Sequence, residues 1–443
     1  MINTLNAILI LICVLVFYCY IYLYQKKQNL SIFHPIIIIN SLIFLFFYFK
    51  HISNYFYKPI HYDKYHHIDL YSLFVVFLFS FFFTLGCILV INKKLYYGFK
   101  IKFNAEVSID KLAYIFVPII LVFSFIVVSS GYYWGNVEQQ NINRNVSIVL
   151  YLNKFLIFFY ILLILPNFRK LRKFEKYVHI ITILICIIYF YMLGEKKNIV
   201  LIFGCLIIFY YYFIQKISLE QSILIFSIFF IFFIFILIPF FSIYRWYIFY
   251  EYPLNSDGLK LLINQFTEIY PSFSDFIFKS FGRFNGIDSL SVLIIETQNN
   301  DILKFGSTFM KFFYSLVPSF ILESKFDLIN GGEIFNRKTY GSFYFSDWSM
   351  FWFSEFYLNF NILGVIILSF ILGLFLTLVF NNIENMHKLI LPLFIFFYIK
   401  NIVNIENEIS IVLATYLKDC IFIVLFLLMF NIISIQQNFN KTI

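Results

Sequence analysis

The hydrophobic and polar positions of this chain alternate in long blocks rather than at the short period of a strand. Most blocks hold roughly 20 apolar residues, the length at which a helix crosses a bilayer. We predict about eleven membrane-spanning helices, at residues 3–24, 31–49, 70–92, 112–130, 148–166, 178–194, 199–215, 221–244, 352–380, 388–404 and 411–434. The predicted fold class is all-α, a polytopic transmembrane helical bundle, because helices satisfy their backbone hydrogen bonds internally in lipid.

One interval between the blocks is much longer than the others. Residues 245–351 are too many for a plain connector. Two stretches in it, 259–278 and 289–314, mix apolar and polar residues, which predicts short helices at the membrane surface or capping the bundle. The predicted organisation is a bundle of eight helices (1–244), a long extracytoplasmic loop (245–351) and three further helices (352–443).

Composition agrees with a membrane protein. Of the 443 residues, 61% are hydrophobic and 13% are charged, whereas a soluble domain has about 25% charged residues. The many Phe and Tyr residues have AT-rich codons, so we do not interpret them as a functional signal. The six cysteines lie in apolar blocks without a C-x-x-C pair, which gives no support to a disulfide or zinc framework.

Lysine and arginine are distributed unequally between the two alternating sets of connections. The poorer set contains Lys50, Lys58, Lys64, Arg144, Lys196 and Lys197. The richer set, which the positive-inside rule assigns to the cytoplasm, contains Lys26, Lys27, Lys93, Lys94, Lys100, Lys102, Lys111, Arg169, Lys170, Arg172, Lys173, Lys176, Lys216, Lys388 and Lys441. The predicted N-terminus and long loop are therefore outside, and the C-terminus is cytoplasmic.

The net charge of +9 has a simple explanation in this topology. The basic residues mark the cytoplasmic connections and contact anionic membrane lipid. No groove-reading motif accompanies them, so no nucleic-acid partner is expected.

Several kinds of chemistry lack their residues. Residues 251–386 contain no His and no Cys, and the chain has no H-E-x-x-H, G-x-S-x-G or Walker A motif. We therefore expect no hydrolase triad, no metal site, no nucleotide site and no cofactor.

Cations at the predicted outer ends of helices are the first candidate functional residues. Lys196 and Lys197 follow a tight turn at a helix N-terminus, where the backbone N–H groups and the lysines favour a phosphate. The alternative is an ordinary turn with snorkelling lysines. Arg245 lies among aromatic residues, where it either anchors the helix or binds phosphate bidentately.

The long loop and the helix after it supply further candidates. Arg283 stands between two glycines and either pairs with Asp288 or presents its guanidinium to a phosphate or sugar. Asp288 is either a helix N-cap or a general base. Glu355, at the start of the ninth predicted span, is expected to pair with an arginine or to act as a base, because a carboxylate at membrane depth is costly.

Three short segments resemble the motifs of one family. Residues 194–198 (Gly-Glu-Lys-Lys-Asn) look like its Gly-x-Arg turn, with Lys in place of Arg. Residues 283–288 look like its outer-loop Arg motif, and residues 355–364 look like its E-x-Y-x-N-F-G-x-x-G motif, with Asn361 replacing a Gly. With its many helices and large late outer loop, the whole chain resembles the Wzy-type oligosaccharide repeat-unit polymerases, which include the O-antigen polymerases.

The resemblance implies an activity and a location. Such an enzyme lies in the bacterial inner membrane and transfers a glycan from undecaprenyl pyrophosphate onto another lipid-linked unit, building O-antigen, capsule or exopolysaccharide. It implies a lipid-linked donor and acceptor, and a chain-length regulator protein, as partners. We assign pyrophosphate binding to Arg245, Lys196, Lys197 and Arg337, and catalysis to Arg283, Asp288 and Glu355.

Two other functions stay open. An O-antigen ligase uses the same donor, but that family uses a His in its large outer loop, and none is present here. A transporter or flippase of lipid-linked glycans would place charges within several spans. Lys154, Lys400, Lys418 and Asp419 lie within predicted spans and keep this alternative open.

Overall fold

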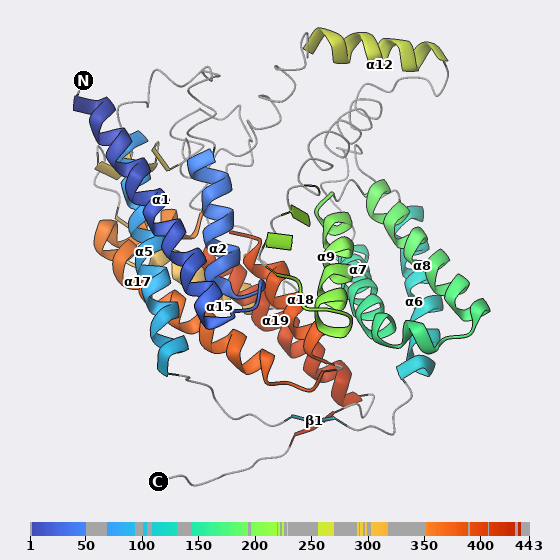
Figure 1. The fold of residues 1–443 in the computed structure, drawn as a ribbon. Coiled ribbons are helices and arrows are strands. Elements are labelled where there is room, and N and C mark those ends of the chain that lie inside the picture. Colours follow the sequence, from blue (N-terminus) through green and yellow to red (C-terminus); the bar gives the residue numbers. More distant parts are fainter. Residues whose placement is uncertain are drawn as a thin grey trace. The chain divides into compact units, whose positions relative to one another are not determined.

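The structure is a computed structural model of the chain (Figure 1). It describes residues 2–49, 69–93, 101–103, 109–130, 144–193, 196–218, 220–221, 224–225, 228, 256–269, 290–291, 293–295, 297–298, 303–317, 351–388, 390–405, 407–429 and 433–435. The following description concerns these residues.

Helices make up nearly all of the described chain, which confirms the all-α class. The N-terminal half contains α1 (Ile2–Gln28), α2 (Pro35–Ile43) with the π-helix η1 (Phe44–Phe49), α5 (Asp69–Lys93), α6 (Ile109–Ser129), α7 (Arg144–Ile164), the 3-10 helix η4 (Leu165–Lys170), α8 (Lys173–Met192) and α9 (Lys196–Phe213). After these come α12 (Ser256–Ile269), the 3-10 helix η6 (Ser307–Phe309), α15 (Met310–Leu316), α17 (Trp352–Glu384), α18 (Leu391–Ile402) and α19 (Ile409–Met429). The eighth predicted span, 221–244, falls largely outside the described residues.

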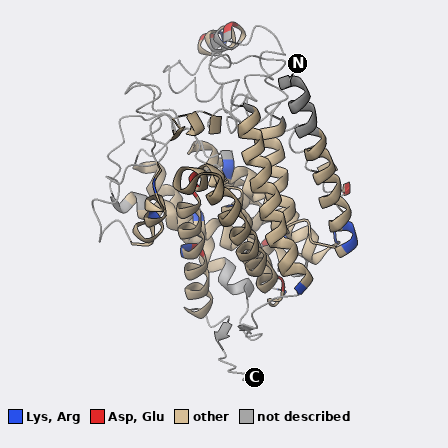
Figure 2. Ribbon diagram, turned by 90° about the vertical axis from the view of Figure 1, so that its left-hand side faces the viewer, with Lys and Arg blue, Asp and Glu red and all other residues tan. Residues whose placement is uncertain are grey.

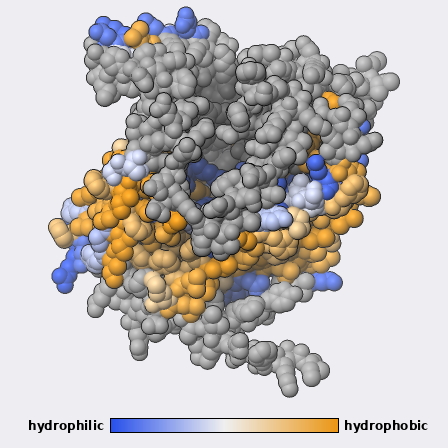
Figure 3. Space-filling model, turned by 180° about the vertical axis from the view of Figure 1, so that it is seen from behind, coloured by the Kyte–Doolittle hydropathy of each residue, from blue (hydrophilic) through white to orange (hydrophobic). Residues whose placement is uncertain are grey.

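Four of the described helices are long and apolar enough to cross a membrane. They cover Leu70–Lys93, Lys173–Met192, Trp352–Glu384 and Ile409–Met429. Large apolar side chains on the described helices are exposed, such as Phe125 (73%), Phe174 (77%) and Leu363 (67%). Much of the described surface in Figure 3 is correspondingly hydrophobic. Water would disfavour such surfaces, whereas lipid would not.

Charged residues are sparse along the helices and occur mainly near their ends (Figure 2). Helix α1, for example, is free of charge until Lys26 and Lys27 in its last turn. This is the pattern from which the sequence predicts a cytoplasmic connection after the first span.

The chain forms two compact units. Unit 1 contains Met1–Phe99, Phe281–Asn385 and Phe397–Phe426, and unit 2 contains Lys100–Ser280, Met386–Phe396 and Leu427–Ile443. Unit 1 therefore joins the first helices of the chain to the last ones.

Two glycines allow the central helices of unit 1 to pack backbone against backbone. A Cβ atom added at Gly373 in α17 would overlap the carbonyl oxygen of Phe83 in α5, and one added at Gly86 would overlap that of Phe370. Cys87 donates a hydrogen bond from Sγ to the Gly373 carbonyl oxygen at 3.6 Å. Small residues serve this close approach in membrane helix pairs, where lipid offers no hydrophobic driving force for association.

Hydrogen bonds fix α1 and α2 to α5 in the same unit. Asn40 in α2 donates to Thr84 Oγ1 in α5 (3.1 Å), and its carbonyl oxygen accepts from the Tyr18 hydroxyl of α1 (2.7 Å). Tyr24, near the end of α1, donates to Asn92 Oδ1 near the end of α5 (2.9 Å). The C-terminal ends of α1 and α5 therefore lie side by side.

Unit 2 contains the α6–α7 pair and a small sheet. Asn153 donates to Ser124 Oγ across α7 and α6 (2.9 Å), and the Tyr160 hydroxyl lies 2.7 Å from His179 Nδ1 of α8. Strand β1 (Ile101–Phe103) pairs antiparallel with β2 (Ile433–Ile435).

The sheet corrects one predicted boundary. The last span was expected to continue to residue 434, but α19 ends at Met429 and Ile433–Ile435 forms β2. The apolar run Ile-Ser-Ile is equally suited to a strand, and its partner lies more than 300 residues earlier.

Candidate functional site

The predicted site residues fall into three groups in the structure. Arg245, Arg283, Asp288 and Arg337 lie outside the described residues. Lys196 and Lys197 begin α9 in unit 2, as expected for a helix N-terminus, and the Lys197 side chain is exposed. Glu355 lies in the first turn of α17 in unit 1. Of the predicted residues that the structure describes, Glu355 alone belongs to unit 1.

Helix α17 is interrupted six residues after Glu355. Phe360 has φ −140° and ψ 19°, and Asn361 has φ 55° and ψ −150°. The Asn361 conformation is one that almost only glycine adopts, and it costs other residues of order 1–3 kcal/mol. The Asn361 side chain compensates in part, because its Oδ1 accepts a hydrogen bond from the Ile362 N–H group (2.8 Å).

The interruption brings the two halves of α17 close together. A Cβ atom added at Gly364 would overlap the carbonyl oxygen of Phe356 and lie 2.8 Å from Phe360 Cβ. Glycine is therefore required at position 364 for a steric reason, and position 361 needs a positive φ. Both positions belong to the segment that resembles the E-x-Y-x-N-F-G-x-x-G motif.

The interruption also leaves carbonyl groups without partners in the helix. The carbonyl oxygens of Leu358 and Asn359 accept hydrogen bonds from the backbone N–H groups of Lys304 (3.1 Å) and Phe305 (3.2 Å). The Gly306 N–H group donates to Asn359 Oδ1 (2.8 Å). We call residues 303–317 the docked segment, because these bonds attach it to α17 much as a neighbouring strand would be attached.

The docked segment turns sharply where it meets α17. Phe305 and Gly306 have φ values of 45° and 86°, which orient three successive N–H groups toward the carbonyl oxygens and the Asn359 side chain. After this turn come η6 and α15, which carry Thr308 and Lys311.

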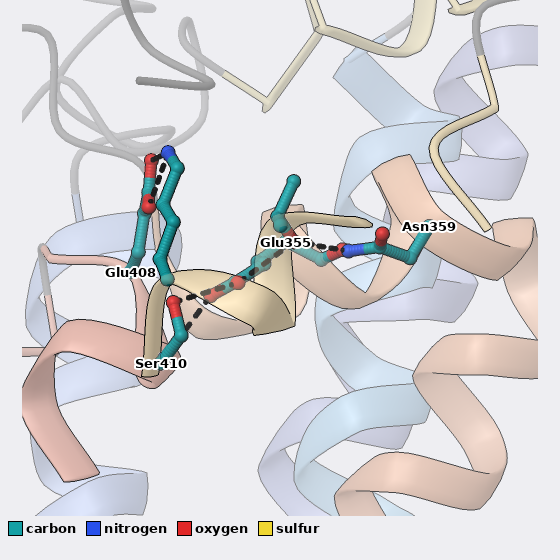
Figure 4. Close-up of polar contacts among 6 residues, drawn as sticks. Glu355, Asn359, Glu408 and Ser410 are labelled. Carbon is teal, nitrogen blue, oxygen red and sulfur yellow. Dashed lines mark hydrogen bonds and ion pairs between the residues drawn. The ribbon is translucent and has the colours of Figure 1, made fainter. Parts of the chain in front are cut away.

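Glu355 is the centre of a buried polar network (Figure 4). Its side chain is fully buried, and its Oε1 accepts from the hydroxyl groups of Thr308 (2.8 Å) and Ser410 (3.0 Å). Its Oε2 accepts from the Ser410 N–H group at 3.4 Å. The network thus joins α17 to the docked segment and to the start of α19.

Asn359 completes this network from the next turn of the same helix face. Its Nδ2 donates to Thr308 Oγ1 (2.6 Å) and to the Glu355 carbonyl oxygen (2.8 Å). Residues four apart lie on one face of a helix, which explains the Glu-x-x-x-Asn spacing. Thr308 is held on both sides, since it accepts from Asn359 and donates to Glu355.

A buried ion pair lies beside the network. Lys311 Nζ is 2.9 Å and 2.8 Å from the two carboxylate oxygens of Glu408, and the two side chains are 10% and 6% exposed. Glu408 is two residues before Ser410, and Lys311 is three residues after Thr308, so the ion pair and the Glu355 network join the same two segments.

A second buried pair connects α18 and α19. Lys400 Nζ lies 3.2 Å from Asp419 Oδ2, which also accepts from Asn401 Nδ2 (2.8 Å). Asp419 is fully buried. This pairing gives two of the charges within predicted spans a structural explanation that does not need a transport pathway.

Sequence reasoning missed Thr308, Lys311, Glu408 and Ser410. Lys311 had a detectable signal, because it is a single charge within the apolar run 309–314, and such a charge usually needs a partner when buried. The two hydroxyl residues had no comparable signal. In the described part of the chain, no group of three or more His, Cys, Asp or Glu residues is arranged to hold a metal ion.

Comparison with known proteins adds no relative. No protein-family model matches the chain, and neither a curated protein nor a solved structure is significantly similar to it.

The conformation of Asn361 leads to a prediction about two substitutions. Asn361→Gly should be more stable than Asn361→Ala by roughly 1–3 kcal/mol, because only the glycine relieves the strained φ and ψ. Unfolding of the purified protein in mixed detergent micelles would measure the difference.

Asn382, in a regular part of α17, is the matched control for this pair. There we expect the reverse order, with Ala more stable than Gly by about 1 kcal/mol. The same order at both positions would contradict the conformation assigned to Asn361.

Proposed function

We propose that the protein is a membrane glycosyltransferase that polymerises oligosaccharide repeat units carried on undecaprenyl pyrophosphate, on the outer face of the bacterial inner membrane. The proposal rests on the resemblance to Wzy-type polymerases. The arrangement of residues 355–364 is the observation that supports it most directly.

Three of the residues that match the family motif have a defined role in one local structure. Glu355 and Asn359 bind the docked segment, and Gly364 admits the carbonyl group of Phe356. Asn361, at a position where the family has Gly, has a positive φ of 55°. A chance match of short motif letters would give no reason for this agreement between residue type and backbone conformation.

The proposed chemistry needs only cations and positioning. The donor already carries a pyrophosphate leaving group, so the reaction requires no nucleotide. Arg283, Arg245 and Lys197 would stabilise the charge that develops on this group as the bond to the sugar breaks, with Lys196 and Arg337 as additional cations. The attacking hydroxyl group loses its proton to Asp288 or is activated by positioning alone.

We assign Glu355 a positioning role within this proposal. Its carboxylate is fully buried and receives three hydrogen bonds from Thr308 and Ser410. A general base must reach the proton that it removes, whereas Glu355 is directed toward the protein interior.

The decisive variant is Arg283→Ala. We expect polymer formation to fall by roughly 100- to 1000-fold, the usual effect of removing one transition-state donor, while single repeat units still reach the cell surface. Surface glycans would be separated by size on a gel. Arg172→Ala, which removes an exposed arginine from a predicted cytoplasmic connection, should leave the ladder unchanged.

Three outcomes would contradict parts of the proposal. Full-length polymer from Arg283→Ala would show that Arg283 is not a catalytic residue. Loss of single repeat units from the cell surface would favour a flippase. In vitro, the purified protein should lengthen lipid-linked repeats without nucleotide or metal, and a strict need for either would exclude the mechanism.

A further inference from the structure

Within α15, the most deeply buried side chain is a charged one. In α15, Lys311 is buried, whereas Met310 and Phe313 are 50% and 60% exposed. Phe305, in the preceding turn, is 75% exposed. Apart from the contacts of Phe309 with Phe356 and Phe360, the position of α15 therefore depends on the burial of Lys311.

We propose that Lys311 and Glu408, which we call the latch, are positioning residues that anchor the docked segment of the long loop to the membrane helices. The functional part of this inference rests on the proposed polymerase activity. The docked segment begins about twenty residues after Arg283 and ends about twenty residues before Arg337. One anchor between them therefore limits how far the chain lets either arginine lie from the membrane helices.

An ion pair between Lys311 and Glu408 suits a contact that must place α15 accurately. A buried ion pair contributes little more to stability than apolar residues of similar size would, but a charge left without its partner is strongly unfavourable. Both carboxylate oxygens of Glu408 contact Lys311 Nζ, at 2.8 and 2.9 Å, so a shift of α15 would separate a buried charge from this partner. The latch thus favours one position of α15 relative to the start of α19. An apolar contact would tolerate small shifts of this helix.

The latch also controls the network around Glu355. Lys311 is three residues after Thr308, and Glu408 is two residues before Ser410, so the same two segments hold both the ion pair and Glu355. Without the lysine, α15 loses its bonds to Glu408, and this pair no longer holds the segment that carries Thr308 against the start of α19. Thr308 and Ser410 would then separate from Glu355, which frees the docked segment.

The first measurement is hydrogen exchange of the purified full-length protein in lipid nanodiscs, without substrate. Lys311→Met should raise the exchange of the amides of residues 304–306, which bond to Leu358 and Asn359, by at least tenfold. The double variant Lys311→Met with Glu408→Gln removes both charges of the latch, and these amides should exchange at least threefold more slowly in it than in Lys311→Met. Lys260→Met, in an exposed pair with Asp257 in α12, is the control and should change nothing.

The second measurement is polymerisation with a lipid-linked repeat unit. Lys311→Met should lower kcat at least tenfold and change KM less than threefold, because displaced cations would fail mainly in the transition state. A purely structural role would lower the amount of folded enzyme and leave kcat per folded molecule unchanged.

The outcomes separate the two proposals. Unchanged exchange in Lys311→Met, or an equal effect in Lys260→Met, would overturn the latch. If Lys311→Met raises hydrogen exchange but leaves kcat unchanged, the latch anchors the docked segment but has no part in catalysis. If wild-type protein does not polymerise, the proposed function and the catalytic part of this inference both fail, while the exchange result still decides the anchor.

Discussion

Gly373→Ala should destabilise the folded protein by about 3 kcal/mol, the upper part of the range for overpacking a closely packed site. The added methyl group would overlap the Phe83 carbonyl oxygen and would also lie 3.2 Å from the Cys87 nitrogen. Both neighbours are backbone atoms of α5, so no side-chain rotation can relieve the overlap and the two helices must separate. Unfolding in mixed micelles, together with the amount of protein that survives purification, would measure the loss.

Gly204 provides the comparison for this variant. It lies in helix α9, and a Cβ atom added there would have no atom within 4 Å. Gly204→Ala should therefore be neutral or should stabilise the protein by up to about 1 kcal/mol through helix propensity. If the two alanine variants had the same stability, α5 and α17 could not cross at these glycines.

Replacement of Glu355 by alanine should also lower the free energy of unfolding substantially. Glu355→Ala leaves the Thr308 and Ser410 hydroxyl groups and the Ser410 N–H group without their acceptor. Hydrogen bonds to a charged group contribute about 1.5–3 kcal/mol each, and relief from burying the carboxylate offsets part of this loss. We expect a net loss of about 3 kcal/mol, measured as above, whereas the exposed Glu268→Ala should stay within about 0.5 kcal/mol of wild type.

Glu355→Gln separates a positioning role from a catalytic one. The amide keeps one acceptor for the two hydroxyl groups and loses the weak contact with the Ser410 N–H group, at a cost of about 1 kcal/mol. We therefore expect polymerisation to stay within about tenfold of wild type. A stable Glu355→Gln protein that is at least 100-fold slower would instead identify Glu355 as a general base.

The sequence predicted the positions of most helices well, for a simple physical reason. A segment that must lie in lipid needs a long apolar block, and the block can be seen without knowing its partners. Helices α5 and α17 accordingly begin within one residue of the predicted spans 70–92 and 352–380. The end of α19 was placed wrongly, because the strand after it is as apolar as the helix.

The candidate site could be predicted only in part. Glu355 was recognisable as a carboxylate at the start of an apolar block, but its partners Thr308 and Ser410 are ordinary hydroxyl residues 47 and 55 positions away. Lys311 and Glu408 are 97 positions apart. A single sequence shows spacing and residue type, whereas these pairs depend on how the helices pack. The same limit explains why Asn361, in a helical run, gave no sign of an interrupted helix.

The joining of early and late helices in unit 1 has a consequence for how the protein is made. Cys87 and Gly373, which are in contact in the finished protein, are 286 positions apart. At roughly 5–20 residues per second, the ribosome needs about fifteen seconds to a minute to reach the second after the first. During that interval α5 stands in the membrane with its glycine face uncovered. Factors that shield unpaired helices during biogenesis would therefore be needed most for the first part of this chain.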